Sequence, residues 1–479
     1  MFDRAELAVQ AAMDAGAVYA DARAVVDRIE SIEVQNQQLR TLNQQEKVGV
    51  GVRALIGSSW GFAATGDLSD ASLRACGVRA AAVAKASAIV AGPPLDFPEV
   101  AVTLASWETP HVENPLEVSA SEKVDMLVDV TATMQSVSGI DVAYGSLSGW
   151  DSDKWFVSST GSAIQQHLVE AGGYYSAMAV GEHETQIRSY PQSFGQFESG
   201  GYEVIRAWNY QDHAQRIAEE AVALLSAPQM EERETDLILE ASQLALQIHE
   251  SVGHAVELDR ILGWEAAFAG TSHLDLTQLG THRYGSDLMS ITADATIPGA
   301  LGTFGYDDEG SPAQSVDIVR DGTWVGVLSG RDSAAAAGLS PGGMVRGDGY
   351  NRIPMVRMTN VGLLPGEGTL DEIIADTDDG VYMGTNRSWS IDDKRLNFQF
   401  GCEIGYEVKD GKLGRMVKNP TYTGITPQFW GSMDRLAGES EWVHWGIPNC
   451  GKGQPVQVAH TGHSASPARF KNVRVGVKG

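Results

Sequence analysis

The segment that most constrains the fold of this chain is SQLALQIHESVGHAVELDRI, residues 242–261, which has helical character and contains His249, Glu250 and His254. On a regular α-helix a spacing of five leaves the two rings about 140° out of register, whereas a spacing of four places them on one side. The rings can meet at one ion only if the helix gains a residue, as in a π-bulge, or ends between them. Gly253 is the residue that can absorb such a distortion. The sequence therefore predicts a bulged or broken helix here.

Two imidazoles beside a carboxylate are typical of a divalent-metal site, in which the carboxylate can act as a general base. Catalytic zinc takes three protein ligands, so His249 and His254 need a third donor, and spacing does not identify it. The alternative is that two of the 11 histidines fall five apart by chance and are ordinary packed or solvated rings. The motif also leaves open whether Glu250 points to the metal or lies on an exposed helix face.

Length and charge set the outer limits. A chain of 479 residues is too long for one ordinary core and suggests two or three domains. Hydrophobic residues make up 43% of it, enough for a substantial interior. The net charge of −27, from 35 basic and 62 acidic side chains, argues against nucleic acid or an anionic membrane as partner.

Cysteine usage and the first residues indicate the compartment. Cys76, Cys402 and Cys450 are too few and too scattered for a disulfide framework. The start, MFDRAELAVQAAMDAG, is typical of an amphipathic helix rather than a signal peptide. No segment approaches the roughly 20 apolar residues of a membrane span. The expectation is a cytoplasmic protein.

Residues 1–226 are expected to form two domains, 1–95 and 96–226. The first has a helix over 4–15, antiparallel strands over 18–64 with a turn at Gly57-Ser58-Ser59, and an alanine-rich helix from Ser69-Asp70 to about 89. Gly92-Pro93-Pro94 then breaks the chain. The second has a helix near 119–136, strands over 139–200 and a helix over 202–226. These helices are expected to cover one face of a long antiparallel sheet.

The third predicted domain, 227–479, opens with the strand TDLILE and passes directly into the histidine helix. It is otherwise rich in glycine, turns and short strands, including a hairpin with Asp410-Gly411 at its tip. The predicted class is α+β: an N-terminal antiparallel sheet with covering helices, then a β-rich C-terminal domain, barrel-like or multi-sheet, that contains the metal-binding helix.

Five segments, in order along the chain, resemble the TldD/PmbA family, specifically its TldD-type metalloprotease branch. They are GVGVRALIGSSWGFAATGDLS (49–69), HESVGHAVELD (249–259), YDDEGSPAQ (306–314), RMTNVGLLPGEGTLDEII (357–374) and PNCGKGQPVQ (448–457). TldD-type proteins resemble zinc peptidases in which a cysteine near the C-terminus joins the two histidines. The matching residue here is Cys450, whose glycine-flanked turn suits close approach of a thiolate, a strong zinc ligand. Cys402 and Cys76 fit buried, inert thiols better.

The resemblance implies Zn²⁺ held by His249, His254 and Cys450. The ion lowers the pKa of a bound water from about 15.7 toward 7, and Glu250 is the candidate general base. His460 and His463 are a further candidate pair of metal ligands, which the cysteine makes unnecessary.

Candidates around the site are less specific. Glu257, Asp259 and the acids of 307–309 are possible partners of the ligand histidines, with ordinary surface acids as the alternative. Arg357 and Arg415 are candidates for holding an oxyanion, with salt bridges as the alternative.

The implied function is a zinc-dependent peptidase that hydrolyses unfolded or small peptides, including leader segments of modified peptides. An extended peptide can bind by adding to a sheet edge. The implied partner is a second copy or a related TldE/PmbA-type subunit. Two other classes stay open: a non-catalytic peptide-binding subunit of a two-subunit protease, against which the intact motif argues, and a metal-dependent amidohydrolase acting on small molecules.

Overall fold

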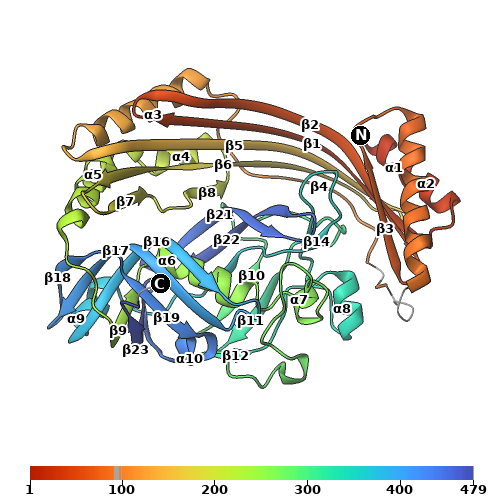
Figure 1. Cartoon of the computed structure of the whole chain (residues 1–479). Coiled ribbons are helices and arrows are strands. Elements are labelled where there is room, and N and C mark those ends of the chain that lie inside the picture. Colours follow the sequence, from red (N-terminus) through yellow and green to blue (C-terminus); the bar gives the residue numbers. More distant parts are fainter. Residues whose placement is uncertain (91–96, 99, 478–479) are drawn as a thin grey trace.

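A long curved sheet lies across a β-rich C-terminal half in the computed structural model (Figure 1), which describes residues 1–90, 97–98 and 100–477. The predicted α+β class is confirmed. The predicted break at Gly92-Pro93-Pro94 and the boundary at residue 95 lie outside the described residues. The other predicted domain limits stay predictions.

The long sheet joins strands from the first two predicted domains. Its main order is β3-β2-β1-β5-β6, all antiparallel, and the β1–β5 pairing links residues far apart in the chain. β4 pairs parallel with β6, while β7 and β8 pair with other parts of β6. The strands are β1 (Tyr19–Gln35), β2 (Gln38–Ile56), β3 (Ser59–Thr65), β4 (Leu104–Glu108), β5 (Ile140–Ser158), β6 (Ala163–Val180), β7 (Thr185–Tyr190) and β8 (Gln196–Ser199). The predicted turn after Ile56 is confirmed by the pair Ile56–Ser59.

Helices cover one face of this sheet and the C-terminal half covers the other. Even-numbered residues of β1, such as Ala22 and Ile32, are buried in the helix-side cores. Odd-numbered residues face the C-terminal half, where Arg23 is 2.9 Å from Asp308. The helices are α1 (Phe2–Asp14), α2 (Asp70–Ser87), α3 (Ala120–Gln135), α4 (Tyr202–Ala207) and α5 (Tyr210–Ser226). Because side chains along a strand alternate between the two faces, one sheet can pack against the helices and against the C-terminal half at once.

The single helix predicted over 202–226 is wrong, because the structure has two. Asn209 takes a left-handed conformation with φ 46° and separates α4 from α5. The neighbouring Trp208 ring packs 5.7 Å from Trp445 of the C-terminal half. A tertiary contact therefore accompanies the break, and helical periodicity alone does not reveal it.

The C-terminal half contains a closed barrel. Five strands close in the order β16-β9-β23-β19-β17, and β17 pairs back with β16. They are β9 (Arg233–Leu239), β16 (Asp379–Ile391), β17 (Asn397–Lys409), β19 (Thr421–Ile425) and β23 (Ala468–Val475), extended by β18 (Lys412–Val417) and β20 (Met433–Leu436). Asp410 and Gly411, with φ of 48° and 74°, form the predicted turn between β17 and β18.

Helix α6 (Ala241–Ile248) is buried over its whole length against the barrel strand β16 and the two-stranded sheet of β21 and β22. A helix covered on every face holds whatever follows it deep in the molecule. The remaining elements are α7 (Leu258–Ile261), β10 (Ile291–Asp294), β11 (Ser315–Arg320), β12 (Thr323–Trp324), α8 (Arg331–Ala337), β13 (Val345–Arg346), β14 (Met355–Val356), β15 (Val361–Leu363), α9 (Leu370–Ala375), α10 (Thr426–Gly431), β21 (Val443–Lys452) and β22 (Gln457–Ala465). None of the described helices is both long and apolar enough to cross a membrane.

Candidate metal centre

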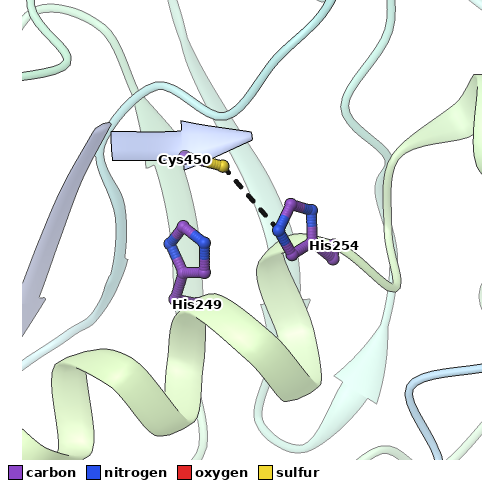
Figure 2. Close-up of side chains that lie close together, drawn as sticks. All are labelled: His249, His254 and Cys450. Carbon is purple, nitrogen blue, oxygen red and sulfur yellow. Dashed lines mark hydrogen bonds between the residues drawn. The ribbon is translucent and has the colours of Figure 1, made fainter. Parts of the chain in front are cut away.

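The two motif histidines bound a single π-helical turn, His249–Gly253, that continues from α6: His249 begins the turn and His254 follows it. The N–H of His254 donates to the carbonyl of His249 over 3.1 Å, a bond across five residues. The extra residue brings both rings to the same side (Figure 2), with centroids 4.8 Å apart and planes at 87°. The predicted bulge is confirmed.

Gly253 has a different role from the expected one. Its φ is not positive, so its backbone does not need the conformational freedom of glycine. Instead, a Cβ atom at this position would lie 2.2 Å from Sδ of Met358, which is fully buried. Gly253 therefore makes room for close packing beneath the turn.

Cys450 reaches the histidines from β21, just after a bulge in its pairing with β22. Its Sγ atom lies 3.7 Å from Nε2 of His254, as the dashed line in Figure 2 shows. The possible ligand atoms of His249, His254 and Cys450 all lie within 4.8 Å of one another, and all three residues are buried. Within the described residues, no other group of three histidine, cysteine or acidic side chains is placed in this way.

Hydrogen bonds fix the tautomer of His249 through a residue that sequence reasoning had set aside. Nδ1 of His463 is 2.9 Å from the Val361 carbonyl, so it must donate. Nε2 of neutral His463 is then an acceptor, and it lies 2.7 Å from Nδ1 of His249. His249 therefore carries its proton on Nδ1 and keeps a lone pair on Nε2, the form that a metal ligand requires.

A buried network fixes His254 in the same way. Its Nδ1 lies 3.0 Å from Oε2 of Glu257 and donates to it, which leaves the Nε2 lone pair on the side of Cys450. Lys452 lies 3.2 Å from the other Glu257 oxygen and 2.8 Å from Asp259. The candidate acids Glu257 and Asp259 thus belong to the centre, and Lys452 neutralises part of their charge.

The protonation states suit metal binding. Burial lowers the pKa of His249 and His254 and depresses that of His463 further. Burial by itself would raise the pKa of the Cys450 thiol, but His254 and Arg357 outweigh this effect and leave that pKa below its usual value. Neutral imidazoles and a readily ionised thiol are the forms that bind zinc.

Glu250 points inward. It is 6% exposed, and its Oε2 lies 2.5 Å from Nη1 of Arg395. Arg395 belongs to the tight turn between β16 and β17, has φ 62°, and its carbonyl accepts a 2.7 Å hydrogen bond from the Thr426 hydroxyl. The alternative of an exposed helix face is therefore wrong for Glu250.

The other candidates divide between the centre and distant positions. Arg357 is close to the centre, where it donates to the carbonyl of Cys450 and, over 3.1 Å, to that of Gln457. Arg415 is exposed and pairs with Glu407 at 2.8 Å, so it has no part in the centre. His460 pairs instead with Glu170 of the long sheet, over 2.5 Å.

The acidic stretch 307–309 lies in the contact between the two halves rather than at the histidines. Asp308 pairs with Arg23, and Glu309 lies 3.0 Å from Arg53. Asp307 accepts 2.9 Å hydrogen bonds from the N–H groups of Glu309 and Ser311 and fixes the turn. The family-like stretch around residues 307–309 therefore belongs to the contact between the two halves of the molecule.

Three residues of the centre escaped sequence reasoning as contributors: His463, Lys452 and Arg395. Lys452 follows Cys450 by two residues, so strand alternation puts it on the same face, and this was an available signal. The sequence predicts His463 only as a possible metal ligand, in a pair with His460. Nothing in its local sequence marks Arg395.

Comparison with known proteins decides the family. Models of three PmbA/TldA metallopeptidase domains match successive parts of the chain: domain 1 at residues 20–88, the central domain at 113–225 and the C-terminal domain at 232–476. The last match alone covers more than half of the chain. The chain belongs to the PmbA/TldD family.

Relatives of this PmbA/TldD protein match along most of its length. A metalloprotease of Methanothermobacter thermautotrophicus is 29% identical over 464 residues, covering 96% of this chain and 95% of the relative. A metalloprotease TldD homolog of Haemophilus influenzae is 28% identical over 423 residues, 86% of this chain and 83% of the relative. A zinc metalloprotease TldD homolog of Saccharolobus solfataricus is 24% identical over 247 residues, 51% and 52% of the two chains.

Solved structures share the fold of this PmbA/TldD protein. A Thermotoga maritima crystal structure superposes with a TM-score of 0.77 at 17% identity, covering 99% of this chain and all of the other. TldE from Thermococcus kodakarensis gives a TM-score of 0.71 at 14% identity, with 98% and 99% covered.

Proposed function

We propose that this PmbA/TldD protein is a zinc-dependent peptidase whose metal is held by His249, His254 and Cys450. The observation that best supports this is the joint arrangement of the π-turn and its hydrogen bonds, which turn an unprotonated Nε2 of each ring toward one buried thiol. Two nitrogens and one sulfur leave zinc a fourth position, as in catalytic rather than closed structural sites. Relatives named metalloproteases, one of them a zinc metalloprotease, support the same conclusion.

The residues around the centre have separable tasks in this proposal. A bound zinc ion would supply a Lewis acid that polarises a peptide carbonyl and makes water more acidic. Glu250 would accept a proton from that water and return it to the leaving amine. Arg395 keeps the Glu250 carboxylate beside the π-turn. His463 and Glu257 hold the two imidazoles in orientation and tautomer.

The proposed substrates are unfolded or small peptides, including leader segments of modified peptides. The burial of Glu250 and the candidate ligands supports this, because an extended chain can reach such a site and a folded surface cannot. We propose a second subunit as well, either another copy or a TldE/PmbA-type relative, and the shared fold of a solved TldE supports the second choice. Three free cysteines agree with the proposed cytoplasmic location.

Metal content and peptide cleavage test the proposal together. We expect about one zinc per chain in the wild type and in Cys76→Ser, whose thiol is buried far from the centre, and a large loss in Cys450→Ser. We expect an unstructured peptide to be cleaved and a folded protein to be spared, with activity lost on chelation. Glu250→Gln should keep its zinc and lose about 10²- to 10⁴-fold in rate.

Two results would overturn the proposal. Full zinc content in Cys450→Ser would remove the sulfur from the metal site. Undiminished cleavage by Glu250→Gln would remove the general base. Hydrolysis of small amides with no cleavage of any peptide would indicate the amidohydrolase alternative.

A further inference from the structure

Arg346 is a positively charged side chain without an anionic partner beside the candidate centre. It lies on β13, and no acidic side chain of the described residues forms an ion pair with it. Its Nη2 donates to the carbonyl of Met358, while its Nε is buried and has no hydrogen-bond partner in the part of the chain that the structure describes. Met358 is the residue that packs against Gly253 of the π-turn. Arg346 therefore contacts the π-turn through a single intervening residue, Met358.

The surroundings of Arg346 compensate its charge only in part. Burial and the neighbouring Arg357 together lower the pKa of Arg346 to about 10, although Glu170, Asp308 and Cys450 act in the opposite direction. The guanidinium carbon of Arg346 lies 5.7 Å from the centre of the Phe304 ring. Since a pKa near 10 leaves the guanidinium charged at neutral pH, the fold holds a poorly solvated cation at this position. A buried charge without a partner is costly, which points to an anion that binds there.

Arg346 lines a cleft of about 160 Å³ between the long sheet and the C-terminal half. The sheet contributes Trp150 and Lys154, and β22 contributes Ala459 and His460. Ala459 is the cross-strand partner of Cys450. The cleft therefore borders the hairpin that brings the sulfur to the candidate metal centre.

Each of the four carboxylates that line this cleft has a hydrogen-bond or ion-pair partner other than Arg346. Asp308 lies 2.9 Å from Arg23 and accepts a 2.7 Å hydrogen bond from the N–H of Gly347. Glu170 pairs with His460 over 2.5 Å. The other two, Asp27 and Asp348, accept hydrogen bonds from the Ser152 hydroxyl and the Val458 N–H, at 2.7 and 2.9 Å.

Lys154 adds a second cation with weak pairing. Its Nζ lies 3.8 Å from Asp308, whose other oxygen already binds Arg23. Together, Arg346 and Lys154 can donate hydrogen bonds to a carboxylate. Arginine is well suited to this because its guanidinium can donate two parallel hydrogen bonds to one carboxylate.

We propose that Arg346, assisted by Lys154, binds a carboxylate of the substrate in this cleft, so that peptides are held by an acidic side chain or by their C-terminal carboxylate. This inference rests on the proposed peptidase function and adds a substrate preference to it. An acidic side chain and a C-terminal carboxylate present the same chemical group to the guanidinium. Peptides that contain only one of the two distinguish them.

The test uses one unstructured peptide sequence in three forms with the zinc-loaded full chain. The first form has a free C-terminus and no acidic residue, the second is amidated and neutral, and the third is amidated with one aspartate. In Arg346→Gln we expect KM to rise about tenfold or more for at least one carboxylate form. We expect the kcat for every form, the KM of the neutral form and the zinc content to stay unchanged. The form that loses affinity identifies the source.

Matched variants separate recognition from folding. Arg346→Lys should retain part of the preference, and Lys154→Gln should weaken it independently. Arg415→Gln, an exposed arginine paired with Glu407, should behave as the wild type. An equal rise in KM for all three forms, or no rise for any, would overturn the inference.

Failure of the proposed function would be visible separately. If the wild type cleaves none of the peptides, calorimetric titration of the three forms into Glu250→Gln still measures carboxylate recognition. Equal affinity for all forms there would overturn the inference by itself.

Discussion

The long N-terminal sheet and the metal-binding half of the molecule are assembled in opposite ways. The sheet grows from hairpins whose strands follow each other in sequence, such as β1–β2 and β5–β6. The candidate centre draws on segments near residues 250, 357, 395 and 450–463, which are far apart in the chain and meet in the folded structure. Hairpins of neighbouring strands therefore supply much of the long sheet, with β1–β5 as its long-range link, whereas the candidate centre consists of long-range contacts.

The two regions also pack differently. Where α1 meets α2, the core is made of alanines, and a Cβ at Gly77 would lie 2.1 Å from the Ala8 carbonyl. The barrel core is aromatic, with the rings of Phe429 and Phe470 stacked 4.1 Å apart. Backbone is closer to backbone in the first region, so enlargement of a side chain there should be tolerated least.

Buried ion pairs occur in both regions with different consequences. In the sheet, Lys123 of α3 pairs with Glu30 of β1, and both are under 5% exposed. In the centre, Lys452 pairs with Glu257, which in turn orients His254. The first pair only joins a helix to a strand, whereas the second reaches a candidate metal ligand.

The largest expected effect is on the stability of the sheet. Lys123→Ala leaves Glu30 buried without its cation, and we expect the free energy of unfolding to fall by about 3–5 kcal/mol. Urea denaturation measures this loss, with exposed Lys85→Ala of α2 as the control. Zinc content of the folded fraction should not change. Loss of zinc without loss of stability would contradict the separation of the two regions.

The next effect belongs to the centre. His463→Ala removes the acceptor that fixes the His249 tautomer, and we expect zinc affinity to fall about 10- to 100-fold. Competition with a chromogenic chelator measures the affinity. His444→Ala on the neighbouring strand, where the ring contacts the Ser464 hydroxyl, is the matched control. Equal zinc affinity in both variants would show that His463 does not orient the ligand.

A smaller effect tests the close packing of α1 on α2. Gly77→Ala forces the backbones apart, and we expect a loss of about 1–3 kcal/mol in unfolding free energy with peptide cleavage unchanged. Gly431→Ala at the end of α10 is the control, because its added Cβ has no heavy atom within 4 Å among the described residues, its chain neighbours and nearby helix backbone aside. If the two variants unfold at the same urea concentration, the contact is not as tight as the structure shows.

The smallest effect concerns a single helix cap. The Ser69 side chain accepts from the N–H of Ser72, and Ser69→Ala should destabilise the start of α2 by about 1 kcal/mol. Hydrogen exchange of the first turn of α2 measures this locally. Ser121→Ala, inside the first turn of α3 rather than at its cap, should leave exchange in α2 unchanged.

Much of the scaffold was predictable because its signals are local. The cap at Ser69, the turn after Ile56 and the Asp410-Gly411 hairpin follow from short-range preferences, and all three are confirmed. The break at Asn209 was not predictable, since it accompanies packing of Trp208 on a residue more than two hundred positions away.

The sequence by itself determined that a helix with histidines five apart must bulge or break if they are to act together, because a regular α-helix points their side chains in different directions. The structure has the bulge. Similarity to a family, rather than spacing, indicated Cys450. Only the tertiary structure decided which side chains orient the rings and face Glu250, because His463, Lys452 and Arg395 come from separate strands and turns. A hydrogen bond acts over about 3 Å in space, and sequence patterns record neighbours along the chain rather than across it.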